Sequence, residues 1–276
     1  GRIDAGHVAT AVELGRERLD RIRRDVHERI TEGTVLIATE GEVTGQVNGL
    51  AVLQVGEIGF GQPSRITANA RLGRGEVVDI EREVRLGGPV HSKAVMILTA
   101  FLGQRYARAV PLSLAATLVF EQSYGGIEGD SATVAELCAL LSAIGDLPLR
   151  QDIAVTGSMD QHGRVQAIGG ANEKIEGFHD VCAARELSGT QGVLLPADNA
   201  RHLMLRSDVA EAVAAGRFAV HVMEEIDDAL ELLTGLPRGR FEDGAWTPGS
   251  FDAHVAQGLA RFAEAARELQ GRAEHT

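Results

Sequence analysis

The chain changes its pattern of apolar residues near Gly33, and this change constrains the fold more than any other feature. Before it, residues 4–31 carry apolar side chains at helical spacing on a charged background. After it, short β-favouring runs alternate first with glycines and then with amphipathic helices, and the 33 glycines fall at turns rather than in a repeat. No period of 20–50 residues is present, which argues against a solenoid. A strand meander followed by an irregular mixture of strands and helices predicts an α+β fold with mixed sheets and packed helices.

The same patterns place the individual elements. We expect strands at residues 34–38, 45–53, 65–70, 77–80, 114–120, 153–156, 165–168, 192–196 and 218–222. We expect helices at residues 4–31, 89–106, 208–215, 225–234 and 251–270, and one helix each at Ser131 and Lys174. The helix that Ser131 opens should bury one face, formed by Val134, Leu137, Cys138, Leu141 and Ile144.

The organisation predicted from these elements has three parts. Residues 32–236 form the main domain, and residues 237–276 form a linker and a separate amphipathic helix. Residues 1–31 have only a thin apolar stripe, so we interpret them as the remnant of an upstream module that packs on something outside the chain. The chain begins with Gly1 rather than methionine, which also suggests a fragment of a longer polypeptide.

Composition excludes several classes of protein. The formal net charge of −12 argues against a nucleic-acid partner, because phosphate binding requires a basic surface. The sequence has no signal peptide and no run of 18 apolar residues, so we predict a cytoplasmic protein without a membrane partner. Cys138 and Cys182 fall on predicted helices, and we expect reduced core thiols rather than a disulfide between them. No zinc motif and no P-loop occurs, so no metal or cofactor is expected on this chain.

Ser131 and Lys174 could form a nucleophile and its base. A serine hydroxyl needs a group that takes its proton, and a lysine amine can do so when its pKa is lowered. The ordinary lysine pKa of about 10.4 must fall to about 7–8, which is a shift of roughly 4 kcal/mol. Burial near Ile168 and Ile175 and a helix N-terminus would both lower it. Backbone N–H groups near the start of the Ser131 helix could hold an oxyanion, with Gly129 leaving the approach open.

Three sequence blocks resemble the signature of the Lon protease proteolytic domain. They are Gly129-Asp130-Ser131-Ala132, Thr156-Gly157 and Gly169-Gly170-Ala171-Asn172-Glu173-Lys174. Asp130 and Ser158 are similar to the residues of the B-type, bacterial Lon-related branch at these positions. The resemblance covers residues 32–236, and the three blocks together are far more specific than any one of them.

The resemblance implies a fold shared with a domain of a small-subunit ribosomal protein and assembly into a homo-hexameric ring. It implies that Thr156 bonds the Lys174 amine and orients it toward Ser131. Substrates would be unfolded or damaged polypeptides, and ATP and Mg would be needed only by an ATPase module that precedes this domain. Glu128 and Asp130 either line the cleft or cap the helix, and His91 and Lys93 match a family segment with a structural or substrate-groove role.

Two other functions remain open at this point. A Lon-like domain can be a ring-forming scaffold without proteolysis, although such a scaffold would be free to lose Ser131 and Lys174. The same dyad can also serve a narrower amidase or a self-processing hydrolase, because the width of the cleft is a property of the three-dimensional structure.

Overall fold

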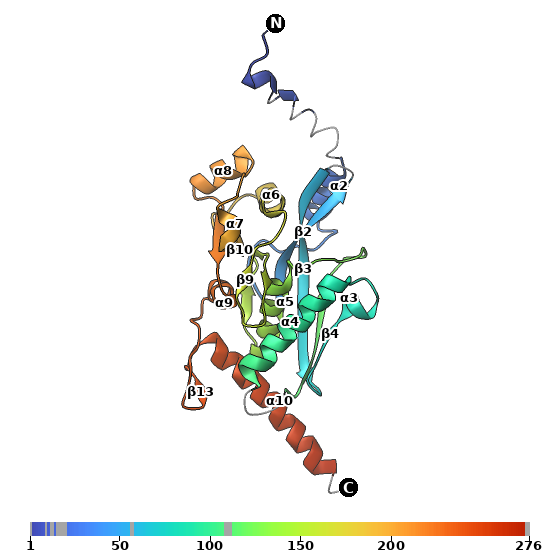
Figure 1. Cartoon of the computed structure of the whole chain (residues 1–276), viewed down its shortest axis with the longest axis vertical. Coiled ribbons are helices and arrows are strands. Elements are labelled where there is room, and N and C mark those ends of the chain that lie inside the picture. Colours follow the sequence, from blue (N-terminus) through green and yellow to red (C-terminus); the bar gives the residue numbers. More distant parts are fainter. Residues whose placement is uncertain are drawn as a thin grey trace.

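The computed structural model describes residues 2–8, 10, 11, 14, 21–55, 58–107 and 112–273. The molecule is elongated, with a mixed β-sheet at its centre, α2 (Arg21–Thr31) toward one end and α10 (Phe251–Ala273) extending toward the other (Figure 1). The helices between them are α3 (Ile80–Glu83), α4 (Pro89–Tyr106), α5 (Thr133–Gly145), α6 (Ala171–Ala184), α7 (Ala197–Ala200), α8 (Ser207–Ala214) and α9 (Ile226–Thr234).

The central sheet has the strand order β11-β10-β7-β2-β3-β5-β4. Its strands are β2 (Gln46–Val55), β3 (Ile58–Leu72), β4 (Glu76–Asp79), β5 (Leu114–Phe120), β7 (Ile153–Val155), β10 (Gly192–Pro196) and β11 (Ala219–Met223). The pairs β2–β3 and β3–β5 are antiparallel, whereas β4–β5, β2–β7, β7–β10 and β10–β11 are parallel. The predicted α+β fold with mixed sheets is therefore confirmed.

Three short two-stranded sheets complete the strands. They pair β1 (Glu42–Thr44) with β6 (Pro148–Arg150), β8 (Ser158–Met159) with β9 (Val165–Gln166), and β12 (Phe241–Glu242) with β13 (Ala245–Trp246). The predicted strand at residues 165–168 ends early, because the Asn199 side chain bonds both the N–H and the C=O of Ile168.

Two hydrophobic cores lie on the opposite faces of the sheet. Successive strand side chains point to opposite faces, and accordingly Ile153 and Val155 lie in one core whereas Ala154 between them lies in the other. The first core surrounds α5, and the second packs α6 on the sheet. Cys138 lies in the first core and Cys182 in the second, both as buried free thiols.

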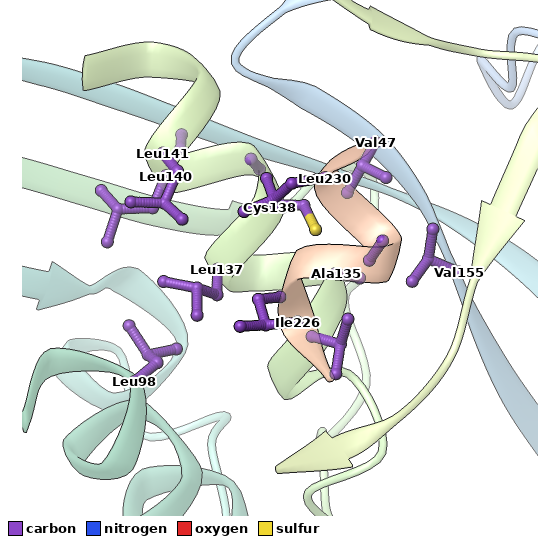
Figure 2. Close-up of a cluster of buried hydrophobic side chains, with 14 of the residues drawn as sticks. Val47, Leu98, Ala135, Leu137, Cys138, Leu140, Leu141, Val155, Ile226 and Leu230 are labelled. Carbon is purple, nitrogen blue, oxygen red and sulfur yellow. The ribbon is translucent and has the colours of Figure 1, made fainter. Parts of the chain in front are cut away.

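The five residues predicted on one face of α5 are all buried, and the burial extends almost all round the helix. Every residue of α5 except Ala143 is buried. One side contacts β2 and β3, and α4, α9 and α10 pack against the helix elsewhere. Figure 2 shows Leu137, Cys138, Leu140 and Leu141 of α5 together with Leu98, Ile226, Leu230, Val47 and Val155. A helix covered on several sides is expected to be apolar all round rather than amphipathic.

Residues 21–31 of the predicted first helix pack on their own domain, whereas the earlier described residues of this helix are exposed. Ile30 of α2 is fully buried in the second core, and Arg23 forms an ion pair of 2.6 Å with Asp180 of α6. Residues 21–31 thus have a packing partner within the chain, and the expectation of a further partner outside it stays a prediction. Residues 9, 12, 13 and 15–20 of the predicted helix lie outside the described residues.

The segment at residues 34–38 is not a strand, contrary to expectation. Side chains from elsewhere take its backbone groups, because Gln122 accepts a hydrogen bond from Leu36 N and donates one to Thr34 O. The guanidinium of Arg185 donates to Ile37 O. β-Favouring composition alone does not make a strand when its hydrogen-bonding groups are already used.

The C-terminal helix is not detached from the domain. Phe251 and Val255 are fully buried in the first core, and a Cβ on Gly258 would lie 1.9 Å from the carbonyl oxygen of Ile144. The preceding segment, predicted as a linker, contains the β12–β13 hairpin. Only the later part of α10 is exposed, as Leu269 shows with 55% exposure.

Candidate active site

Ser131 lies in a turn just before α5. The helix begins at Thr133 with Ala132 as its N-cap, so Ser131 precedes the helix rather than opening it. The N–H groups of Thr133 and Val134 are already bonded, to Asp130 O at 3.1 Å and Gly157 O at 3.1 Å. The helix-start donors expected for an oxyanion are therefore partly occupied, whereas the N–H groups of Ser131 and Ala132 make no hydrogen bond within the described part of the chain.

The segment after β7 fixes the position of this turn. Gly157 N and Thr156 Oγ1 both donate to the carbonyl oxygen of Ser131, at 2.8 Å and 3.1 Å. A Cβ on Gly157 would lie 2.7 Å from the terminal methyl of Met223 and 3.0 Å from a methyl of Val134, so glycine lets this strand end pack closely against the core. Thr156 and Gly157, which follow strand β7, thus fix the backbone of Ser131 by hydrogen bonds.

Lys174 reaches Ser131 from the first turn of α6. Its Nζ donates to Ser131 Oγ at 2.8 Å and to Thr156 Oγ1 at 3.0 Å. The whole residue is only 2% exposed. The structure therefore brings together the three side chains that the sequence analysis selected from three separate elements.

Burial changes the acidity of Lys174. Removal from water lowers the pKa of its ammonium group to about 8, and the nearby negative charge of Asp130 opposes this shift. An amine with this pKa is partly neutral near neutral pH, whereas an exposed lysine is not. The arrangement can therefore take a proton from a hydroxyl without a histidine.

A glycine in β3 allows α6 to come this close. A Cβ on Gly61 would lie 1.9 Å from Glu173 O and 2.8 Å from Lys174 Cα, so the strand backbone rests directly on the helix turn that carries the lysine. Gly177 faces Gly61 in the same contact. The sequence analysis missed this role of Gly61, although a glycine inside a strand is a known sign of close backbone approach.

Gly129 and Asp130 shape the turn before the serine. Gly129 has φ of +97°, a conformation that strongly favours glycine, and no atom lies within 4 Å of the position of a Cβ. Asp130 makes no side-chain cap on α5; its Oδ2 instead accepts a hydrogen bond of 2.9 Å from Ser158 Oγ. Of the two predicted roles for Asp130, the helix cap is not found, and the charge of the carboxylate acts on the pKa of Lys174.

Glu128 caps a different helix from the one expected. Its Oε1 accepts a hydrogen bond of 3.1 Å from Val90 N in the first turn of α4. Gly88 is the residue just before α4, and a Cβ on it would lie 1.3 Å from Glu128 Oε2. The lack of a side chain at Gly88 therefore makes room for the Glu128 carboxylate. Glu128 thereby ties the loop before the nucleophile to α4.

His91 of α4 lies in a buried cluster with three carboxylates. Its Nε2 is 3.2 Å from Asp79 Oδ2 and 3.8 Å from Glu136 Oε1, and the His91 ring and all three carboxylates are at most 2% exposed. Glu81, the third carboxylate, accepts a hydrogen bond from Phe120 N. This placement supports a structural role for His91, and Lys93 on the same helix is exposed.

The cluster holds protons more tightly than water-exposed groups would. Burial raises the pKa of Glu136 to about 7, although the charge of His91 opposes the shift. Burial alone would lower the pKa of His91, but Asp79, Glu136 and Glu81 outweigh it and raise that pKa. A proton is thus retained in the cluster at a pH where free carboxyls have lost theirs.

We expect Glu136→Gln to stabilise the protein at alkaline pH. The folded-state pKa of Glu136 lies above its ordinary value of 4.5, so the free energy of unfolding falls as pH rises from about 4.5 through about 7. Glutamine removes this loss, and the gain at pH 8 should be roughly 1–3 kcal/mol, with little gain below pH 4.5. Thermal unfolding at both pH values checks it, and parallel loss of stability in both proteins at alkaline pH would contradict it.

One group of potential metal ligands occurs among the described residues, formed by His179, Asp180 and Asp208. Arg206 bonds both carboxylates, and Arg23 forms a further ion pair with Asp180. The guanidinium groups therefore already neutralise the acidic atoms that a cation would use.

Comparison with known proteins places this site in a family. Residues 125–235 match the family model of the Lon protease (S16) C-terminal proteolytic domain, which spans Ser131, Thr156 and Lys174. The chain belongs to the Lon protease family. The predicted membership is therefore confirmed.

The relatives of this Lon-family chain include bacterial and archaeal proteins. A "Putative Lon protease homolog" of Escherichia coli (strain K12) is 47% identical over 213 residues, which cover 76% of the chain and 36% of the relative. The protein of the same name in Haemophilus influenzae is 45% identical over 216 residues, 78% of the chain and 36% of the relative. An "Archaeal Lon protease" of Thermococcus kodakarensis is 33% identical over 198 residues, 71% of the chain and 28% of the relative.

The chain thus spans about a third of the length of the curated relatives it matches. Within the described ranges, no helix has the length and apolar character needed to cross a membrane.

Proposed function

We propose that the chain is a serine endopeptidase domain in which Ser131 is the nucleophile and Lys174 is the general base. The observation that carries this proposal is the hydrogen bond of 2.8 Å between Lys174 Nζ and Ser131 Oγ, made by a lysine that is 2% exposed. The matched family model is that of a proteolytic domain. A serine nucleophile can be activated by a lysine in place of a histidine, so a Ser-Lys pair is consistent with this family.

In the proposed reaction, neutral Lys174 takes the proton of Ser131 Oγ as this oxygen attacks the carbonyl carbon of the peptide bond. The resulting tetrahedral oxyanion is held by the free N–H groups of Ser131 and Ala132. The carbon–nitrogen bond then breaks, and the Lys174 ammonium gives its proton to the leaving amine. An acyl ester remains on Ser131.

Water completes the cycle. Lys174, neutral again, takes a proton from a water molecule as the water oxygen attacks the carbonyl carbon of the ester. The bond from this carbon to Ser131 Oγ then breaks, and Lys174 returns the proton to Ser131 Oγ as the acid product leaves. Thr156 keeps the amine aimed at the serine, because its Oγ1 accepts from Lys174 Nζ and donates to the backbone of Ser131. Thr156 is therefore proposed as a positioning residue.

The pH dependence of hydrolysis tests this proposal. Because only the neutral amine acts as a base, activity should rise with pH and reach its plateau above the Lys174 pKa of about 8. Digestion of fluorescent casein over a pH series, with and without a covalent serine-directed inhibitor, measures it. A maximum at acid pH would favour a carboxylate mechanism, and no inhibitor-sensitive digestion at any pH would favour the non-catalytic scaffold.

The wider setting of the domain is also part of the proposal. We expect unfolded or damaged polypeptides as substrates, a hexameric ring, a cytoplasmic location, and ATP and Mg only on an ATPase module elsewhere. The relatives are about three times as long as the matched segment, which leaves room for such a module. Light scattering checks the ring, because a strict monomer with full peptidase activity would contradict it.

A further inference from the structure

The buried residue Ser158 bonds the exposed side chain of the residue that precedes the nucleophile. Its Oγ donates to Asp130 Oδ2 at 2.9 Å, and the residue is 3% exposed at the start of the β8–β9 pair. Within the described residues, the Asp130 side chain makes no other hydrogen bond. Ser158 Oγ is also 3.5 Å from Gln166 Oε1, a longer and weaker contact.

Asp130 and Lys174 carry opposite charges but form no ion pair. Asp130 is the one charged side chain whose field acts on the pKa of Lys174, against the larger effect of burial. Even so, the hydrogen bonds of Lys174 Nζ go to Ser131 and Thr156, not to this carboxylate. Asp130 is exposed and directly precedes Ser131, and its charge acts on Lys174, so its carboxylate would be expected to turn toward the ammonium unless something else holds it.

We propose that Ser158 is a positioning residue that holds the Asp130 carboxylate away from Lys174 and so leaves the amine free to bond Ser131. This inference rests on the proposed function of the dyad. The neighbouring residues support it, because Thr156 and Gly157 bind the backbone of the nucleophile turn and Ser158 binds its side chain. The three consecutive residues thus fix both the serine and the one charge that competes for the base.

The test compares Ser158→Ala, Asp130→Asn and the double variant in a pH series of peptide hydrolysis. In Ser158→Ala the freed carboxylate pairs with Lys174, so the pH of half-maximal kcat/KM should rise by about one unit, with a roughly tenfold loss of activity at pH 7. Asp130→Asn should shift the midpoint downward. The double variant should have the midpoint of Asp130→Asn alone, because Ser158 acts only through the charge of Asp130.

Thr133→Ala is the matched control. Thr133 Oγ1 donates to the backbone carbonyl of Asp130 at 2.5 Å, so its loss loosens the same turn without freeing the carboxylate. We expect no shift of the midpoint in this variant. The inference is overturned if Ser158→Ala lowers activity equally at every pH, or if Asp130→Asn does not remove its shift. If Lys174→Met stays active, the proposed function itself fails. If Lys174→Met is inactive but the pH midpoint of kcat/KM in Ser158→Ala is that of the wild-type protein, the role of Ser158 alone fails.

Discussion

Ser131→Ala and Lys174→Met should each lower peptide hydrolysis by at least about 10³-fold, and combining them should cost little more. The losses should not add because the two side chains act as one unit, joined by the 2.8 Å hydrogen bond. Methionine keeps the length and apolar stem of lysine but has no amine. Since a buried charge is often replaced by an apolar group without loss of stability, Lys174→Met should stay folded.

The sequence offers a control for this experiment. Lys93 and Lys174 are the only lysines of the chain, and Lys93 is exposed on α4. Lys93→Met should therefore leave hydrolysis near the wild-type rate, and circular dichroism should show all the variants folded. Near-normal activity of folded Ser131→Ala or Lys174→Met would contradict the dyad.

Asp252→Ala should lower the free energy of unfolding by about 3 kcal/mol, the largest effect on stability expected of a single substitution. Asp252 is fully buried and binds Arg105 through both carboxylate oxygens, at 2.8 Å and 3.0 Å. It also accepts hydrogen bonds from Tyr106 OH at 2.6 Å and Gly239 N at 2.8 Å. Alanine leaves these donors without their partner in the core, although Arg105 keeps its ion pair with Asp227.

Chemical denaturation measures this loss, with Glu264→Ala as its control. Glu264 is an exposed acid on the same helix, so its removal should change stability by no more than about 0.5 kcal/mol. Equal stability of the two variants would show that the start of α10 is not part of the folded domain.

Deletion of residues 238–276 should accordingly unfold the domain. If α10 were a detached helix, the deletion would mainly weaken an assembly.

Regular burial made much of the fold predictable. In β5 the residues Leu114, Ala116, Leu118 and Phe120 are buried alternately, and α4 begins at Pro89, so both elements agree with their predicted ranges. Where long-range contacts replace local pattern, prediction failed or was incomplete. Residues 34–38 lose their strand because Gln122 and Arg185 bind the backbone, and α5 is enclosed because α10 returns from the far end of the chain.

The candidate site shows the same division. Ser131, Thr156 and Lys174 could be selected from sequence because each lies in a short distinctive block, and the structure brings them within hydrogen-bond distance. The contact of Glu128 with α4 and the close approach of Gly61 to α6 depend on how distant elements pack. A glycine inside a strand hints at a close approach but does not say what approaches it, so the partners in both contacts became visible only in three dimensions.

The central claim is that Lys174 activates Ser131, and labelling of Ser131 measures it most directly. The protein is treated with a serine-directed fluorophosphonate at about pH 9, above the Lys174 pKa of about 8, and the modified peptide is identified by mass spectrometry. The account predicts an adduct on Ser131 in the wild-type protein and almost none in Lys174→Met. An adduct on another serine, or equal labelling of Ser131 in both proteins, would contradict it.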